Sequence, residues 1–91
     1  MLKTLEELIE VIRKRKTSSL EKSYTSKLLK DKKLSVEKVK EEIGELIEAV
    51  EKDTNKIHES ADVLYHLAVF LEANSIKIED VMKELEKRKN K

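Results

Sequence analysis

The sequence predicts an all-α protein, folded as a small bundle of about five helices. Proline is absent and glycine occurs once, whereas a sheet protein would need both residues in its turns. Apolar residues recur every three to four positions, which is the spacing of a helix face. The polar segments between these stretches are short, and short connections favour antiparallel neighbours. A chain of 91 residues is therefore expected to form one domain (1–91), whose thin core a partner subunit would help to complete.

Two helices are predicted in the first part of the chain. The first is expected from about residue 2 to residue 16, because four apolar residues recur there at helical spacing: Leu5, Leu8, Ile9 and Ile12. Ser18 followed three residues later by Glu21 is a capping-box pattern. A second helix is therefore expected to begin there and to run through Leu28 and Leu29.

A third helix is predicted to begin at Ser35, which is a good N-cap residue, and to end near residue 52. Its apolar face is expected to consist of Val39, Ile43, Leu46 and Val50. A tight turn at 53–55 follows. The short connection predicts that this helix and the next form an antiparallel hairpin.

The fourth helix is predicted over about 56–73, and its many apolar residues indicate burial on most sides. Asn74 is expected to end it in the left-handed conformation that glycine more often adopts. A last helix is predicted over about 78–89, with Val81, Met82 and Leu85 on its apolar face.

Charge and composition argue against several classes of protein. Twenty basic and nineteen acidic residues give a net charge of +1, so binding to nucleic acid through bulk charge is not expected. No apolar run is long enough to span a bilayer, and no signal peptide is recognisable, so no membrane partner is expected. The chain lacks cysteine, which suits a reducing compartment. We therefore expect a cytoplasmic protein.

Acidic residues on the two hairpin helices form the candidate functional site. The segment E-S-A-D (59–62) opens the most apolar stretch of the chain, where an unpaired buried carboxylate is energetically costly. At about 100° per residue, Glu59, Asp62 and His66 share one face of their helix, while Glu42 and Glu45 border the apolar face of the preceding helix. An antiparallel hairpin can therefore bring Glu42 and Glu45 opposite Glu59 and Asp62.

Four facing carboxylates cannot all stay ionised without a cation, because each disfavours the ionisation of the others. Oxygen ligands without cysteine suit Mg²⁺ or Mn²⁺ better than zinc. Such ions hold pyrophosphate oxygens and activate water. Solvated helix faces or structural ion pairs would also explain the acidic residues, and the residues alone leave the metal site and the structural explanation about equally open.

Several motifs resemble a known group of enzymes. E-E-I-G-E (41–45) followed by E-S-A-D (59–62) resembles the E-E-x-x-E…E-x-x-D pattern of the all-α nucleotide pyrophosphohydrolases related to MazG. S-Y-T-S-K-L-L (23–29) and A-D-V-L-Y-H-L (61–67) resemble the phosphoribosyl-ATP pyrophosphohydrolase family, which acts in the second step of histidine biosynthesis. The similarity extends over nearly the whole chain.

The resemblance implies a MazG-like helical bundle, a homodimer, and Mg²⁺-dependent hydrolysis of phosphoribosyl-ATP to phosphoribosyl-AMP and pyrophosphate. It assigns Mg²⁺, with Mn²⁺ as the alternative, to Glu42, Glu45, Glu59 and Asp62. Glu41 completes the implied catalytic set, as a further ligand or as a base for the attacking water. An association with phosphoribosyl-AMP cyclohydrolase, the next enzyme, is left open.

Substrate contacts are implied for a further group of polar residues: Arg13, Ser23, Tyr24, Thr25, Lys27 and Lys38. Tyr65 and His66 also match the family, but packing with one satisfied hydrogen bond is the expected role for both. His58 is expected on the surface.

Three other functions remain as alternatives. The nearest is a house-cleaning pyrophosphohydrolase that acts on (deoxy)nucleoside triphosphates with the same metal site. A di-iron carboxylate bundle would use E-x-x-H pairs, which the sequence lacks. A helical interaction module without catalysis would explain the apolar stripes, but it leaves the acidic pair in the apolar helix unexplained.

Overall fold

The computed structural model describes residues 2–17 and 23–89, and these residues form five helices without a strand. In chain order the helices are α1 (Lys3–Thr17), α2 (Tyr24–Lys30), α3 (Lys32–Lys52), α4 (Lys56–Ala73) and α5 (Ile78–Arg88). The predicted all-α fold is thus confirmed. The predicted capping box at Ser18 and Glu21 lies outside the described residues.

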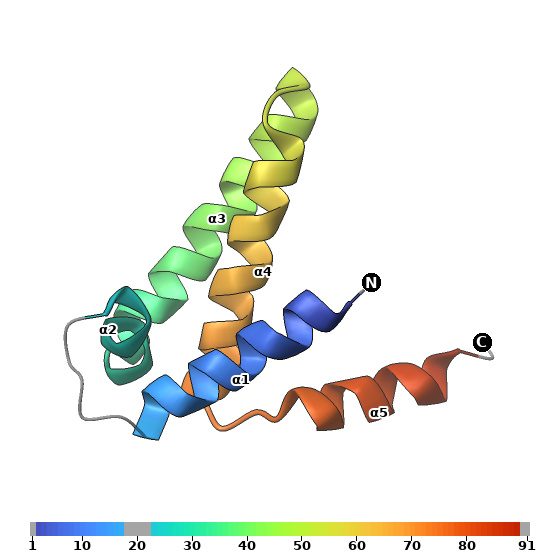
Figure 1. The fold of residues 1–91 in the computed structure, drawn as a ribbon. Coiled ribbons are helices and arrows are strands. Elements are labelled where there is room, and N and C mark those ends of the chain that lie inside the picture. The colour runs from blue at the N-terminus through green and yellow to red at the C-terminus, as the bar shows by residue number, and fades with distance from the viewer. Residues whose placement is uncertain (1, 18–22, 90–91) are drawn as a thin grey trace.

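The two longest helices, α3 and α4, form the antiparallel hairpin that the sequence predicted, and they lie side by side along most of their length (Figure 1). The turn between them uses left-handed backbone conformations at Asp53 (φ 56°) and Asn55 (φ 41°). Asp and Asn tolerate this conformation better than other residues with a side chain. The D-T-N turn therefore reverses the chain without a glycine.

The hydrophobic core lies where α1 and α2 meet the second half of α4. Its buried members are Ile12, Leu28, Ala68 and Val69, and both Ile12 and Val69 have no exposed surface. In Figure 1 the α1 helix crosses this part of α4, whereas the outer half of the hairpin projects away from α1. The first half of α4, which carries the acidic residues, is consequently outside the main core.

Two predicted helix ends are wrong by one or a few residues. Helix α3 begins three residues before Ser35, because Asp31 caps it by accepting a hydrogen bond from the Leu34 N–H at 3.0 Å. The Asp31 N–H also donates to the Lys27 carbonyl, so α2 and α3 are joined through a single residue. At the end of α4, Asn74 has φ −101°, and Ser75 (φ 58°) takes the left-handed conformation instead.

The predicted apolar face of α3 is wrong for Ile43 and Val50, because the helix is rotated towards its acidic side, whereas Val39 and Leu46 are half-buried. Ser35, Glu42 and Ala49 are buried, whereas Ile43 is 43% exposed and Val50 is 58% exposed. Residues seven apart lie on one face of a helix, so this face of small and acidic residues is turned inward.

Helix α4 is likewise less buried than predicted. Ile57, Leu64 and Leu67 are exposed in the single chain. Apolar stripes on both hairpin helices are therefore left uncovered by the part of the chain that the structure describes.

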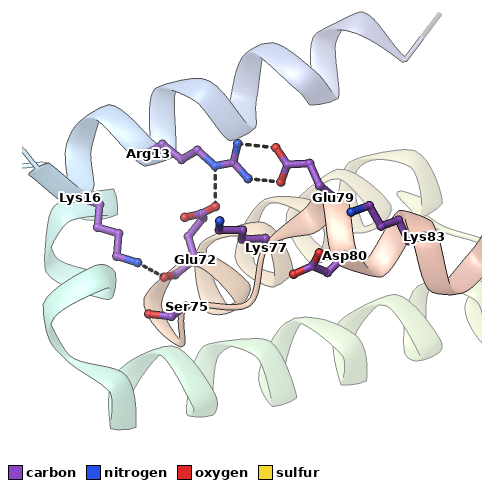
Figure 2. A pocket seen from close by; sticks show the side chains of 8 residues that line it. All are labelled: Arg13, Lys16, Glu72, Ser75, Lys77, Glu79, Asp80 and Lys83. Carbon is purple, nitrogen blue, oxygen red and sulfur yellow. Dashed lines mark hydrogen bonds and ion pairs between the residues drawn. The ribbon is translucent and has the colours of Figure 1, made fainter.

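Helix α5 has no buried residue, and an ion pair joins its first turn to α1. Figure 2 shows Arg13 of α1 between Glu72 of α4 and Glu79 of α5. The Arg13 guanidinium donates to Glu72 Oε1 at 2.7 Å and to both Glu79 oxygens at 2.8 and 2.5 Å. This contact lowers the pKa of Glu79 to about 2. Arg13 thus joins three helices, and such bidentate pairs are among the stronger polar contacts.

Candidate active site

Three carboxylates from the two hairpin helices meet at one point. Glu42 and Glu45 of α3 and Glu59 of α4 each offer an oxygen, and these oxygens lie within 4.8 Å of one another. Glu42 is only 9% exposed, Glu59 is half-buried and Glu45 is exposed. The hairpin thus brings together three of the four carboxylates that the sequence placed on facing helices.

Asp62 borders this group one helical turn after Glu59. It forms a second group with His58 and Glu59, again with ligand atoms within 4.8 Å of one another. His58 lies on the surface as predicted, 73% exposed, with its Nε2 3.4 Å from Asp62 Oδ2. Because Glu59 belongs to both groups, Glu42, Glu45, Glu59 and Asp62 are contiguous. We refer to these four residues as the carboxylate cluster.

Two oxygens of the carboxylate cluster are buried without a hydrogen-bond partner, namely Glu42 Oε2 and Glu59 Oε2. Burial raises the pKa of Glu42, and the charge of nearby Glu45 raises it further. Burial is also the first cause of the raised pKa of Glu59, followed by the closeness of Glu45. In the protein alone, the cluster is therefore an unfavourable arrangement of like charges.

A structural ion pair does not account for this arrangement. The lysines of α3 that form ion pairs in the described chain contact Glu41 and Glu48, outside the cluster. The side chain that the structure places beside the Asp62 carboxylate is that of exposed His58. A hard divalent cation would supply what the unpartnered oxygens lack, since such ions are bound by several carboxylate oxygens. The acidic groups are thus suited to hold an ion.

Glu41, the fifth predicted catalytic residue, lies outside both groups of candidate ligands. It is exposed, and its Oε2 accepts a hydrogen bond from Lys38 Nζ at 3.2 Å. Glu41 is also the main cause of the raised pKa of Lys38. The structure therefore couples the predicted base to a predicted substrate-binding residue.

The S-Y-T-S-K segment (23–27) lies against α4 through two side-chain hydrogen bonds. Tyr24 Oη is 2.9 Å from His66 Nε2, and Thr25 Oγ1 is 2.5 Å from Tyr65 Oη. The rings of Tyr24 and Tyr65 are stacked, with centroids 6.3 Å apart. The sequence predicted one hydrogen bond for His66, but it did not predict that Tyr24 would be a partner. The two residues are 42 positions apart, and no local pattern indicates that they meet.

The other predicted substrate residues differ in how free their polar groups are. The Ser23 hydroxyl caps α2 by accepting from the Ser26 N–H at 3.0 Å, and it donates to the Ser26 hydroxyl. Lys27 is exposed. Arg13 is engaged by Glu72 and Glu79, and Glu72 lies thirteen residues beyond Glu59 on α4, which corresponds to about 20 Å along a helix. The structure does not bring Arg13 to the carboxylate cluster.

Comparison with known proteins identifies the family of this chain. Residues 5–89 match the family model described as phosphoribosyl-ATP pyrophosphohydrolase. The chain belongs to this family. The match includes all four residues of the carboxylate cluster and the S-Y-T-S-K segment.

Individual relatives agree with the family match. The chain is 42% identical to the phosphoribosyl-ATP pyrophosphatase of Leptospira biflexa, over 89% of this chain and 91% of the relative. It is 46% identical to the enzyme of the same name from Clostridium acetobutylicum, over 96% of this chain and 82% of the relative. No solved structure matches the chain.

A third relative is a longer protein, the histidine biosynthesis bifunctional protein HisIE of Pyrococcus furiosus. Identity is 45% over 97% of this chain, but the chain spans only 42% of that relative.

In the described part of the chain, no helix combines the length and the apolar character that crossing a membrane requires.

Proposed function

We propose that this chain hydrolyses phosphoribosyl-ATP between its α and β phosphates, giving phosphoribosyl-AMP and pyrophosphate, the second step of histidine biosynthesis. Membership of the phosphoribosyl-ATP pyrophosphohydrolase family supports this reaction, as do relatives named for it. The observation that carries the proposal is the carboxylate cluster with its two buried, unpartnered oxygens. We propose that residues 1–91 form a single phosphoribosyl-ATP pyrophosphohydrolase domain. A cytoplasmic location stays a prediction.

In this proposal Glu42, Glu45, Glu59 and Asp62 hold Mg²⁺, with Mn²⁺ as the alternative. A bound ion of this kind offsets the charge of pyrophosphate oxygens and lowers the pKa of water. The four carboxylates lie on two packed helices, and helices fix the positions of metal ligands more precisely than loops do. Glu41, beside the cluster on α3, is proposed as the base that takes a proton from the attacking water.

The reaction needs no covalent intermediate. A water oxygen forms a bond to the α phosphorus. The bond between the α phosphorus and the oxygen that bridges the α and β phosphates breaks, and pyrophosphate leaves with that oxygen. Lys27 and Lys38 are the proposed partners of phosphate oxygens. Ser23 and Thr25 position the segment, since Ser23 caps α2 and Thr25 pairs with Tyr65 of α4.

The test of this function is release of pyrophosphate by the purified protein with phosphoribosyl-ATP, dUTP and dCTP as separate substrates. We expect Mg²⁺-dependent turnover that is fastest with phosphoribosyl-ATP. Faster turnover of dUTP or dCTP would instead assign the house-cleaning function to the same site. Absence of turnover with all three substrates would remove the proposal.

Lys27→Ala is expected to weaken substrate binding without affecting the metal. The exposed ammonium group is free to meet a phosphate oxygen, and losing one charge-assisted contact should raise the KM about tenfold. Mg²⁺ affinity, measured by calorimetry, should stay unchanged because the carboxylate cluster is intact. Lys3→Ala on α1 removes the same charge elsewhere and serves as the control. An unchanged KM would assign Lys27 to the solvated surface.

We also propose that the chain is a homodimer that covers the apolar stripes of its hairpin. Ile47 is 55% exposed and Leu64 is 51% exposed, and the stripes that contain them run along α3 and α4. Exposed apolar surface of this extent commonly marks a protein interface. The HisIE relative, which is bifunctional, further supports a proposed association with the cyclohydrolase that follows in the pathway.

Light scattering is expected to give about twice the chain mass of 10.6 kDa for the unaltered protein. Ile47→Glu should give the monomer mass, because an ionised carboxylate would have to be buried in the interface. Lys40→Glu changes an exposed residue of the same helix and should leave the dimer intact. A monomeric unaltered protein with full activity would contradict the proposed dimer.

A further inference from the structure

A cavity opens beside the carboxylate cluster, towards the turn that joins α3 and α4. Its volume is about 370 Å³, and Glu45 and Glu59 of the cluster form part of its wall. The end of α3 and the turn supply further lining residues, among them Lys52, Thr54 and Asn55. A molecule held at the cluster therefore has room to extend towards the turn.

The charges around this cavity suit an anion only when a cation is also present. Lys52 is the one basic residue among the described residues that line it, against three carboxylates, those of Glu45, Glu48 and Glu59. Without a cation these carboxylates repel an anion. Once a bound ion offsets the charge of Glu45 and Glu59, Lys52 can attract phosphate oxygens.

Two donors in the cavity wall are available to a ligand. Lys52 Nζ lies 2.5 Å from Glu48 Oε1, but the two side chains are 66% and 58% exposed, and exposed pairs of this kind contribute little to stability. A phosphate can thus replace Glu48 as the partner of Lys52. Asn55 makes no side-chain capping bond to α4, so its amide group is free to donate as well.

Lys52 and Lys38 lie on opposite sides of the cluster along α3. Lys38, Glu45 and Lys52 are spaced seven residues apart and share one face of the helix. Each lysine is about 10 Å from Glu45 along the helix axis. Figure 1 shows α2, which carries most of the S-Y-T-S-K segment, beside the beginning of α3, and the turn at the opposite end of the hairpin. The cavity and the S-Y-T-S-K segment are therefore on different sides of the cluster.

We infer that the cavity receives the β and γ phosphates of the substrate, which leave as pyrophosphate, and that Lys52 and Asn55 donate hydrogen bonds to them. This inference rests on the proposed function for the identity of the substrate. It gives the bound substrate a direction, with the leaving pyrophosphate towards the turn and the nucleoside towards Lys38 and α2. Phosphoribosyl-ATP carries a further phosphate on its added ribose, so basic residues have a role on both sides of the cluster.

Calorimetry with inorganic pyrophosphate and AMP as separate probes tests this direction in the full chain. In Mg²⁺, Lys52→Gln should weaken pyrophosphate binding about tenfold, as expected for the loss of one charge-assisted contact, and leave AMP binding nearly unchanged. Lys38→Gln should weaken AMP binding and leave pyrophosphate binding nearly unchanged. In EDTA, pyrophosphate should not bind measurably to the unaltered protein, because the carboxylates then repel it.

Lys40→Gln is the matched control, since it removes an exposed lysine from another face of α3 and should affect neither probe. Unchanged pyrophosphate binding in Lys52→Gln would overturn the inference, because the probe would then be held at the cluster alone. Weaker binding of AMP but not of pyrophosphate in Lys52→Gln would also overturn it, by placing the nucleoside at the turn.

Asn55→Asp tests the second donor while keeping the shape of the turn. Asp tolerates the left-handed conformation of Asn55 (φ 41°), so the fold should be retained, which a thermal melt checks. A carboxylate then replaces a donor, and pyrophosphate should bind more than tenfold more weakly. Unchanged pyrophosphate binding would remove Asn55 from the site. Absence of phosphoribosyl-ATP turnover would contradict the proposed function, whereas weaker pyrophosphate binding in both variants would still support the cavity as its site.

Discussion

Glu42→Gln is expected to abolish most of the activity while leaving the metal-free fold equally stable or more stable. Glu42 is the most buried member of the carboxylate cluster, and one of its oxygens has no donor. In the unaltered protein its ionised form is opposed by burial and by the charge of Glu45. A glutamine amide removes that charge and can donate a hydrogen bond to the neighbouring carboxylates, so the free energy of unfolding should rise by about 1 kcal/mol.

The same substitution removes a proposed metal ligand. Loss of a group that stabilises developing charge lowers kcat by about 100- to 1,000-fold in other enzymes, and a similar loss is expected here. Asp62→Asn should show the same combination of low turnover and retained metal-free stability, since the side chain beside its carboxylate in the structure is that of exposed His58.

Thermal melts in EDTA and turnover in Mg²⁺ together check this prediction. Glu48→Gln provides a matched control, because Glu48 lies on the same helix and its pKa is lowered by an ion pair with Lys52. That variant should keep full activity and lose a little stability. If Glu42→Gln instead lowered the metal-free melting temperature strongly and kept near-normal turnover, the cluster would be a structural feature and not a catalytic site.

Mg²⁺ is expected to stabilise the fold strongly. It should also reverse the pH dependence of the free energy of unfolding between neutral and mildly acidic pH. Binding of an ion at about 100 times its Kd contributes about 2.7 kcal/mol, which for a chain of this size raises the melting temperature by on the order of 10 °C. The stabilisation should fade as the pH falls, because protons compete with the ion for the carboxylates.

The metal-free protein should behave in the opposite way between neutral and mildly acidic pH. The raised pKa values of Glu42 and Glu59 mean that the folded chain binds more protons than the unfolded chain above the ordinary carboxyl pKa of 4.5. The free energy of unfolding should therefore rise as the pH is lowered from neutral towards the ordinary carboxyl pKa.

At lower pH a different carboxylate decides the outcome. Arg13 lowers the pKa of Glu79 to about 2. The contribution of Glu79 to stability is therefore fully present above the ordinary carboxyl pKa of 4.5, and it is lost as the pH falls from there to about 2. The metal-free melting temperature should thus pass through a maximum at mildly acidic pH.

Melting temperatures in EDTA and in Mg²⁺ across this pH range measure both effects. Glu42→Gln should flatten the rise in EDTA and reduce the gain from Mg²⁺. A metal-free melting temperature that falls steadily from neutral pH downward, with no gain from Mg²⁺, would show that the carboxylates are already paired within the protein.

The sequence by itself determined the helices and their approximate ends, because helix formation depends on local spacing and on the near absence of glycine and proline. It also determined that Glu42 and Glu45 would face Glu59 across a hairpin, since a short turn leaves two adjacent helices little choice but to run antiparallel. The core positions Ile12 and Leu28 followed from the same periodicity.

Only the tertiary structure decided which side of each helix is buried. The periodicity of α3 allowed Ile43 or Glu42 to face inward, and packing against α4 selected Glu42. The pairing of Tyr24 with His66 joins residues 42 positions apart, and Arg13 meets Glu79 across 66 positions. Local patterns specify a helix and its apolar stripe, but the rotation of that helix and its distant contacts depend on the surfaces that pack against it.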